Sequence, residues 1–446
     1  MDPPPETSVA SVPFRDAVRF WVKLGFVNFG GPTGQIAIMH HELVERRRWI
    51  DEDHYLHALN FAMLLPGPEA HQLAIYVGWL LNGAPGAFAA GVFFLLPALV
   101  LMLVLSWVYV THGDVAWVAA VLAGLSWAAV GIVAAALVRI AGRALKNRLE
   151  VGVAIAAFVA LFVFGVPFPL VVLGAGGIGL VAGTRFPRIL PEGVADRAVR
   201  APGPERVRPT WRRSAKVLVI GLLVWLGPLA MVVLAAGSDS VLAEEAVFFC
   251  VMALVTFGGA YAVLAYVNQA AVTRFGWLTS DEMAVGLSLA ETTPGPLILT
   301  VVFVGFVAAY RSPGSLEPLA AGLAGGLVTA WATFVPSFLW IFLGAPSVES
   351  LRGNRRLSSG LSAITAAVVG VVANLGLVFA VSVLFDRTDA VRVLGHEIVL
   401  PAPGSLDPLA FAVAVGAFAA MWRFRANVVW VVLGAGVVGW ARWLVG

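Results

Sequence analysis

Apolar stretches of roughly 20 residues recur along this 446-residue chain, and they constrain its fold more than any other feature. A stretch of that length can cross a hydrocarbon core about 30 Å thick as one helix. Only 12% of the residues are charged, whereas soluble domains carry roughly 25%. The sequence therefore predicts an all-α polytopic membrane protein. Its thirteen candidate segments are 16–39, 56–83, 86–110, 115–140, 150–166, 167–184, 215–236, 244–268, 283–310, 317–344, 358–385, 408–422 and 426–445.

Several classes of protein are not expected from this composition. The net charge of +3 is too small to indicate a nucleic-acid partner. The single cysteine, Cys250, excludes an intramolecular disulfide and a thiolate metal cluster. Histidines at 40, 41, 54 and 57 are not preserved in the repeat described below, so no metal site is expected. No cofactor, nucleotide-hydrolysis motif or cleaved signal peptide is expected either.

The distribution of charge in the loops predicts how the chain is oriented. The interval 185–214 is rich in arginine and proline, and basic loops favour the cytoplasm. With the N-terminus also cytoplasmic, an odd number of crossings places the C-terminus on the periplasmic or extracellular side. Three acidic residues are expected outside: Asp239, Glu244 and Glu245.

The chain repeats itself with an offset of 228. Residues 29–68 align without a gap on 257–296, and 13 of these 40 positions are identical. Each repeat holds six apolar segments, and 215–236 belongs to neither. One unpaired segment between two even-numbered repeats inverts the second, as in many secondary transporters. The expected domains are a first repeat at 1–184, a linker with its connecting helix at 185–243, and a second, inverted repeat at 244–446.

Both repeats carry a Pro-Gly-Pro sequence inside an apolar segment, at 66–68 and at 294–296. Two prolines around a glycine remove amide donors and clash with the preceding turn, so the helix must break there. The Gly-Gly pairs at 30–31 and 258–259 predict two further breaks. Inside the hydrocarbon core, non-helical backbone is tolerated only where it contacts protein or water.

The charge of one loop disagrees with the side of the membrane on which thirteen full crossings would place it. The loop 41–55 carries three arginines, at 46–48, yet thirteen crossings would place it outside. If the broken segments on either side of it fold back as re-entrant hairpins, the loop stays cytoplasmic. The sequence does not choose between full spans and re-entrant hairpins.

A broken helix exposes amide groups and positive partial charge at the N-terminus of a half-helix, where an anion is favoured. Glycine lets the anion approach the backbone, and hydroxyl groups can donate to its oxygens. We therefore expect an oxyanion site where the four breaks meet. The residues expected to bind substrate are Gly30, Gly31, Pro66, Gly67, Pro68, Gly258, Gly259, Tyr261, Thr292, Thr293, Pro294, Gly295 and Pro296.

Three charged residues are expected inside the membrane, where the orientation of the loops does not explain them. They are the candidates for coupling or charge pairing: Lys23, Glu69 and Glu291. Glu69 follows a break, where a carboxylate can cap the next helix. Glu291 ends a half-helix, where the helix dipole disfavours negative charge, so it is the better candidate for a proton carrier. Lys23 could bind substrate, pair with Glu69 or extend to the interface.

Several motifs resemble the chromate ion transporter family in its long, two-domain form. They are Phe29-Gly30-Gly31-Pro32, the run Glu42 to Trp49, Leu65-Pro66-Gly67-Pro68-Glu69-Ala70, Phe257-Gly258-Gly259-Ala260-Tyr261, and Ala290-Glu291-Thr292-Thr293-Pro294-Gly295-Pro296. The resemblance implies export of chromate across the bacterial inner membrane, which confers resistance. It also implies energy from the membrane gradient, with sulfate as the close chemical analogue.

The residues by themselves identify the substrate only as an oxyanion, so two alternatives stay open. One is a transporter of sulfate or another anion. The other is a membrane-embedded enzyme acting on lipid, with Glu69, Glu291 and the histidines as acid–base groups. The duplicated breaks favour a transporter, because an enzyme seldom needs two equivalent broken segments. The coupling ion, protons included, and the oligomeric state, a homodimer included, are left open.

Overall fold

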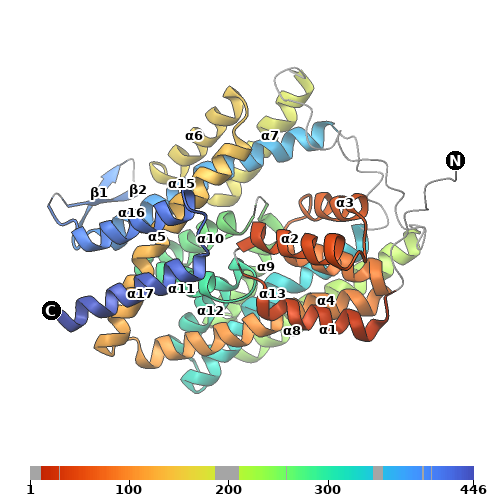
Figure 1. Ribbon diagram of the computed structural model, residues 1–446, viewed down its shortest axis with the longest axis horizontal. Helices are drawn as coiled ribbons and strands as arrows, with labels where there is room; N and C mark the ends of the chain where they lie inside the picture. The colour runs from red at the N-terminus through yellow and green to blue at the C-terminus, as the bar shows by residue number, and fades with distance from the viewer. Residues whose placement is uncertain are drawn as a thin grey trace.

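The computed structural model describes residues 12–29, 31–185, 210–257, 259–344, 355–393, 396–402 and 404–445. Sixteen α-helices make up most of this part of the chain (Figure 1). The helices up to the linker are α1 (Phe14–Val27), α2 (Gly31–His40), α3 (Glu52–Ala62), α4 (Glu69–His112), α5 (Ala116–Ala144), α6 (Arg148–Phe162) and α7 (Phe168–Arg185). Those after it are α8 (Trp211–Ala236), α9 (Val241–Val255), α10 (Ala260–Asn268), α11 (Ser280–Thr292), α12 (Thr300–Arg311), α13 (Pro318–Gly344), α15 (Arg355–Leu384), α16 (Pro408–Trp422) and α17 (Val428–Val445).

Short irregular elements complete the described fold. Wide turns of π-helix follow α2 and α10, at His41–Arg46 and Gln269–Arg274. A 3₁₀ turn, Leu297–Leu299, precedes α12. Strands β1 (Thr388–Val393) and β2 (His396–Pro401) form an antiparallel hairpin after α15, which the sequence analysis did not predict.

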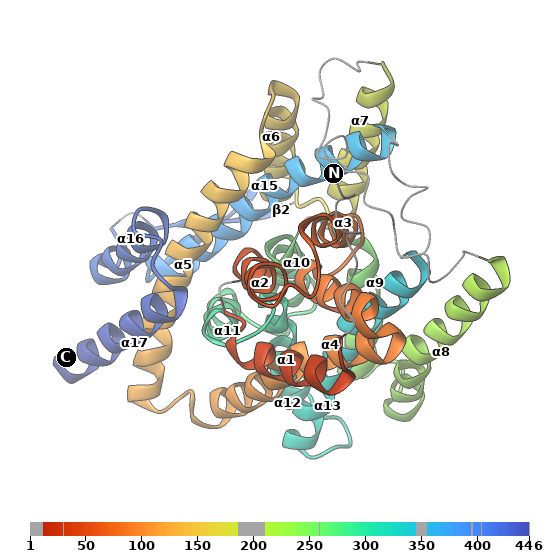
Figure 2. The same ribbon diagram turned by 45° about the vertical axis from the view of Figure 1, so that its right-hand side comes forward.

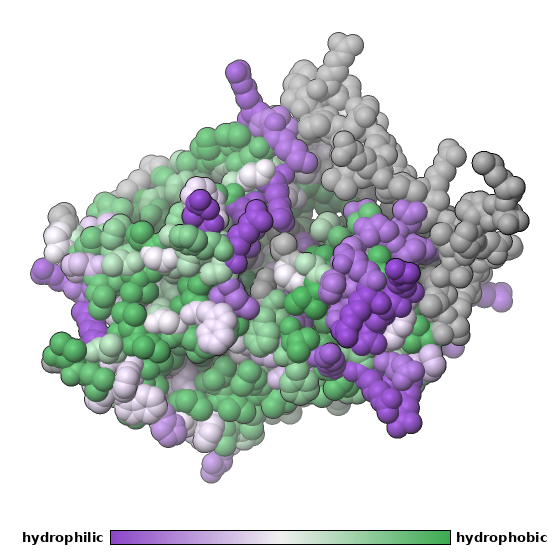
Figure 3. Space-filling view, in the orientation of Figure 1, coloured by the Kyte–Doolittle hydropathy of each residue, from purple (hydrophilic) through white to green (hydrophobic). Residues whose placement is uncertain are grey.

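The prediction of an all-α polytopic membrane protein is confirmed. Six helices of the described chain are long and apolar enough to cross a membrane: α4, α5, α8, α13, α15 and α17. Helix α5 has 29 residues, which at 1.5 Å each give a length of about 43 Å. Hydrophobic residues also cover much of the face in Figure 3, as expected for a surface in contact with lipid.

The helices α5 and α15 each pack against the closing helix pair of the other half of the chain. Helix α5 contacts α16 and α17, whereas α15 contacts α6 and α7 (Figure 2). Gly131 of α5 lies against the backbone of α16 at Ala414, and Gly370 of α15 lies against α6 at Ala154. Because a Cβ at either glycine would collide with that backbone, glycine permits both close crossings.

Helix α8 lies at one edge of the molecule, where it is labelled at the right of Figure 2. Most of its apolar side chains are exposed, Leu234 to 84% and Leu223 to 66%. One face packs against α13, where the Trp225 indole donates to the carbonyl of Ala332 over 3.0 Å. A helix so exposed and so apolar suits a position between the protein and lipid.

Candidate functional site

Helices end at all four breaks that the sequence predicts. Helix α1 stops at Val27 and α9 at Val255, each just before its Gly-Gly pair. Helices α3 and α11 stop before the two Pro-Gly-Pro sequences. The glycines between the prolines, Gly67 and Gly295, have φ of +117° and +137°. Residues with a side chain rarely adopt that backbone conformation, so glycine is required at both turns.

The four breaks lie together and are joined by a reciprocal pair of backbone hydrogen bonds. The amide of Gly67 donates to the carbonyl of Thr256 over 3.1 Å. The amide of Gly295 donates to the carbonyl of Asn28 over 2.8 Å. The two bonds are related by the offset of 228, so each Pro-Gly-Pro turn is bonded to the residue that lies two positions before the Gly-Gly pair of the other repeat.

Because the Gly67 and Gly295 amides are used in these bonds, the backbone donors left at the breaks are those in the first turns of the helices that begin there. The first turn of any helix leaves its amides without an intrahelical acceptor. Helix α4 starts at Glu69, and α10 starts after Gly259, whose φ is +96°. An oxygen of the Glu69 carboxylate lies 3.8 Å from the position that a Cβ on Gly259 would take. Two half-helix N-termini from different repeats therefore approach each other beside one carboxylate.

Two glutamines donate hydrogen bonds to backbone carbonyls at the Pro-Gly-Pro turns. Gln35 of α2 is fully buried, and its side-chain amide donates to the carbonyls of Gly295 and Asn28. Gln72 of α4 donates to the carbonyl of Pro66 over 2.7 Å. The sequence analysis gave these glutamines no role. The feature of the sequence that could have identified them is an amide side chain within an otherwise apolar stretch.

Glu291 and Tyr261 form the second polar contact at the breaks. The Tyr261 hydroxyl donates to Glu291 over 2.7 Å, and Glu291 is only 6% exposed. Arg139 of α5 acts electrostatically on both groups. The sequence analysis gave no role to Arg139, although it lies inside the apolar segment 115–140.

The remaining predicted site residues lie in different surroundings. Lys23 is exposed on α1 and makes no ion pair with Glu69 or any other described acid. The hydroxyls of Thr292 and Thr293 donate to the carbonyls of Leu289 and Ala290 in their own helix. Gly30 and Gly258 lie outside the described residues. The first Pro-Gly-Pro turn is partly exposed, whereas the second is buried.

Glu245 corrects the interpretation of the acidic residues expected outside. It lies within α9, is 0% exposed, and neither of its carboxylate oxygens has a hydrogen-bond partner. The prediction that only Lys23, Glu69 and Glu291 are charges at depth is therefore wrong. Sequence alone could not reveal this, because Glu245 follows a loop and is enclosed by the packing of α12 and α13.

The basic loop 41–55 lies beside the first half of α1. The Phe20 and Trp49 rings are 5.4 Å apart, and the Arg47 guanidinium lies 5.0 Å from the Phe20 ring centre. In the second repeat the equivalent rings, Phe248 and Trp277, are 6.0 Å apart. In each repeat the loop that carries the tryptophan thus packs against the middle of the first helix.

Two polar clusters lie at separate points along α4. At the kink inside the helix, where Gly83 has φ of +65°, the Asn82 amide donates to the carbonyl of Val12 over 2.8 Å. Near the C-terminal end of the helix, Glu282 accepts hydrogen bonds from Tyr109, over 3.0 Å, and from Arg311. The start of α1 therefore lies near the kink, and the start of α11 and the end of α12 lie near the C-terminal end of α4.

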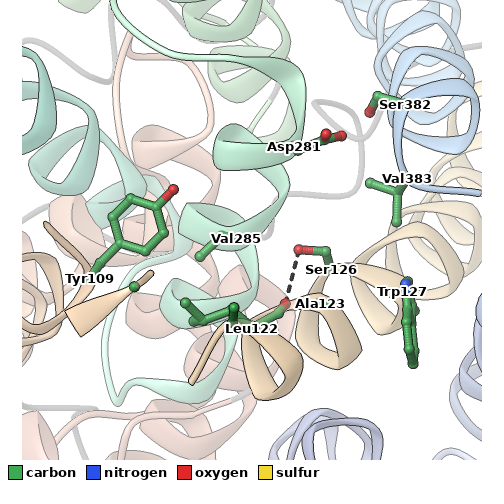
Figure 4. A pocket seen from close by; sticks show the side chains of 11 residues that line it. Tyr109, Leu122, Ala123, Ser126, Trp127, Asp281, Val285, Ser382 and Val383 are labelled. Atoms are coloured by element: carbon green, nitrogen blue, oxygen red, sulfur yellow. Dashed lines mark hydrogen bonds between the residues drawn. The ribbon is translucent and has the colours of Figure 1, made fainter. Parts of the chain in front are cut away.

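One cavity of the described chain lies away from the breaks, at the Tyr109 end of α4 (Figure 4). It has a volume of about 290 Å³, and Asp281 faces Ser382 across it. A second cavity of about 460 Å³ lies beside Thr292 and is lined mainly by apolar side chains of α5 and α17. Neither cavity contains Glu69, Gly259 or Tyr261, so neither coincides with the junction of the breaks.

A polytopic helical protein whose half-helices meet at their broken ends belongs to the class of membrane transporters. The chain matches the chromate transporter family twice, over residues 15–180 and 243–440. It is therefore a member of the chromate transporter family, in the long form with two family regions. Membership makes it an anion transporter and not an enzyme.

Curated relatives cover most of the chain. The chromate transport protein of Cupriavidus metallidurans is 29% identical over 88% of this chain and 90% of its own length. The probable chromate transport protein of Synechococcus elongatus is 29% identical over 83% and 86% of the two chains. An uncharacterized transporter of Methanocaldococcus jannaschii is 25% identical over 81% and 83%. No solved structure matches this chain.

Proposed function

We propose that this chain is a secondary transporter that exports chromate across the bacterial inner membrane and gives chromate resistance. The family and the names of its relatives support the substrate. The observation that carries the proposal is the reciprocal bonding of Gly67 to Thr256 and of Gly295 to Asn28. Such a junction must rearrange when one repeat moves against the other, as alternating access requires.

The proposed oxyanion site is the junction of the breaks. An anion between the first turns of α4 and α10 would meet free amides and two positive helix ends. Gly259 leaves room for the anion, and Glu69 lies beside it. The Glu69 carboxylate would repel a dianion when ionised and donate to it when protonated. On the other side of the anion, Tyr261 supplies a hydroxyl group, Glu291 is the proton carrier and Arg139 is the cation.

The proposed topology has re-entrant hairpins in place of full spans at the four breaks. Residues 12 and 82 lie together, and the loop at Trp49 packs against Phe20 of α1. A chain that leaves and returns to the same end has not crossed. The domains are then two inverted repeats, at 1–184 and 244–446, joined through 185–243. The N-terminus lies in the cytoplasm and the C-terminus outside, in agreement with the basic loops.

Chromate and sulfate are both tetrahedral dianions of similar size, so a site of amides and hydroxyls separates them poorly. Transport of sulfate or another anion is therefore the second candidate. Reaction with lipid is the least favoured alternative, because two equivalent breaks in opposite repeats suit alternating access better than catalysis.

The test is flux through the purified full-length protein in proteoliposomes, with chromate and sulfate supplied under imposed pH and voltage gradients. We expect chromate to move, with a rate that depends on the gradient, and sulfate to compete. Sulfate movement without chromate movement would establish the second candidate. Failure of chromate to move under every gradient would refute the proposal, and a change in lipid mass would point to the enzyme.

A further inference from the structure

Glu245 is a buried carboxyl group for which the proposed site gives no role. It is the fifth residue of α9, so it lies about 6 Å along the axis from the start of that helix. It is 0% exposed, and both oxygens lack a hydrogen-bond partner. Buried polar groups are almost always paired, so an unpaired carboxyl group at this depth requires an explanation.

Small residues pack closely around Glu245. One carboxylate oxygen lies 3.0 Å from the position that a Cβ on Gly325 of α13 would take. Gly325 in turn lies against the carbonyl of Gly305 and the side chain of Ala309 in α12. Three close-packed helices of small residues thus enclose the carboxyl group.

Among the described residues, no cation faces Glu245 from the elements packed against α9. Helix α13 contains no titratable residue over Pro318–Gly344. The charge that acts on Glu245 is the neighbouring Glu244, and it is of the same sign. The other titratable groups on these elements lie at helix ends or have partners: Arg212, Arg213 and Lys216 at the start of α8, Arg311 and Tyr310 at the end of α12, and Tyr261 and Tyr266 on α10.

An ionised carboxylate without a cation or a donor is incompatible with this low-dielectric packing. The neutral acid is compatible, because it buries one hydroxyl and one carbonyl group instead of a full charge. The contact between α9 and α13 therefore selects the protonated form, and separation of these helices into water would release the proton.

We propose that Glu245 is a proton-binding site of the transport cycle, protonated while α9 packs on α13 and ionised when the two helices part. This inference rests on the proposed function for its place in a cycle. The proton exchanges with water at the α8–α9 loop, which is the outer side in the proposed topology. The equivalent position in the first repeat is Ala17, which cannot bind a proton. The proton is therefore linked to the movement of the second repeat alone.

The first test reads protonation directly and does not depend on transport. Infrared spectra of the purified protein with ¹³C-labelled glutamate report the C=O stretch of protonated carboxyl groups. We expect E245Q to lose a component of this band near neutral pH, whereas E244Q, the matched neighbour, retains it. An undiminished band in E245Q would overturn the proposal. E245D, which keeps a shorter acid, should shift the component and covers the case in which E245Q does not insert.

The second test places the proton in the cycle. In proteoliposomes that transport chromate, the wild-type flux should change with pH on the side of the α8–α9 loop. The flux of E245Q should lose that dependence while still carrying chromate, and E244Q should behave as wild type. An unchanged pH dependence in E245Q would overturn the link to transport. Absence of chromate flux in the wild type would refute the proposed function instead, while the infrared result on Glu245 would stand.

Discussion

Single glycines determine whether the breaks can form. Gly295 has φ of +137°, and a Cβ there would contact the Cβ of Ala98. We expect Gly295→Val to insert into the membrane but to abolish chromate flux, since the backbone strain costs about 1–3 kcal/mol at this junction. Gly227→Ala on α8 is the matched control, because a Cβ there meets open space. Unchanged flux in Gly295→Val would remove this break from the site.

A second prediction concerns the pair formed by Tyr261 and Glu291. Tyr261→Phe removes the hydroxyl that donates to Glu291 and leaves the ring in place. One lost hydrogen bond to a buried carboxyl group is worth about 1.4 kcal/mol, so chromate flux should fall roughly tenfold. Tyr266→Phe on the same helix is the control, and its flux should match wild type. Equal fluxes in both variants would show that the hydroxyl of Tyr261 has no part in transport.

The proton carrier at the breaks has its own test. If Glu291 carries the coupling proton, Glu291→Gln should lose the response of chromate flux to an imposed pH gradient. Glu282→Gln, which changes a carboxyl group at the far end of α11, serves as the control for stability. A response to pH that is equal in Glu291→Gln and wild type would remove Glu291 as a carrier.

At the scale of one element, the π-helical turn His41–Arg46 depends on charge. Burial raises the pKa of Glu42, but hydrogen bonds from Arg46 and Arg47 outweigh it and lower the pKa below the ordinary value of 4.5. A lowered folded-state pKa stabilises the fold above the unfolded pKa, and the stabilisation is lost as the pH falls through the folded value. Melting temperatures in detergent should therefore differ between wild type and Glu42→Gln at neutral pH. The two should converge in acid, and a constant difference would contradict this role.

The helix breaks could be predicted from the sequence, because Pro-Gly-Pro forbids a helix whatever surrounds it. The partners of those breaks could not be predicted. That Gly67 bonds to Thr256, and that Gln35 reaches Gly295, depends on how residues more than 180 positions apart pack. Glu245 shows the same limit, since its burial comes from α12 and α13 and not from its neighbours in the sequence. Arg139 could have been found from the sequence, because it is a charged residue inside the apolar segment 115–140.

At the scale of the whole molecule, the two repeats interlock. Helices α5 and α15 each pack against the closing helices of the opposite half, and the breaks are bonded across the same boundary. Neither half can therefore move at the junction without a change in the other half. Such coupling suits a transporter that opens to one side at a time.

The inverted topology can be tested with thiol labelling. In a Cys250→Ala background, Arg48→Cys and Gly276→Cys place single thiols in the second loops of the two repeats. Re-entrant hairpins put these loops on opposite sides of the membrane, Arg48 with the N-terminus. An impermeant maleimide added to intact cells should label Gly276→Cys only. Labelling of Arg48→Cys from outside, with Gly276→Cys protected, would contradict the hairpins and favour thirteen full spans.

The central claim is that an oxyanion binds where the four breaks meet. The most direct measurement is a structure of the protein with chromate bound, located by the anomalous scattering of chromium. We expect the anomalous peak between the first turns of α4 and α10, beside Gly259 and within reach of Tyr261. A peak in the cavity between Tyr109 and Asp281, with none at the breaks, would contradict the account.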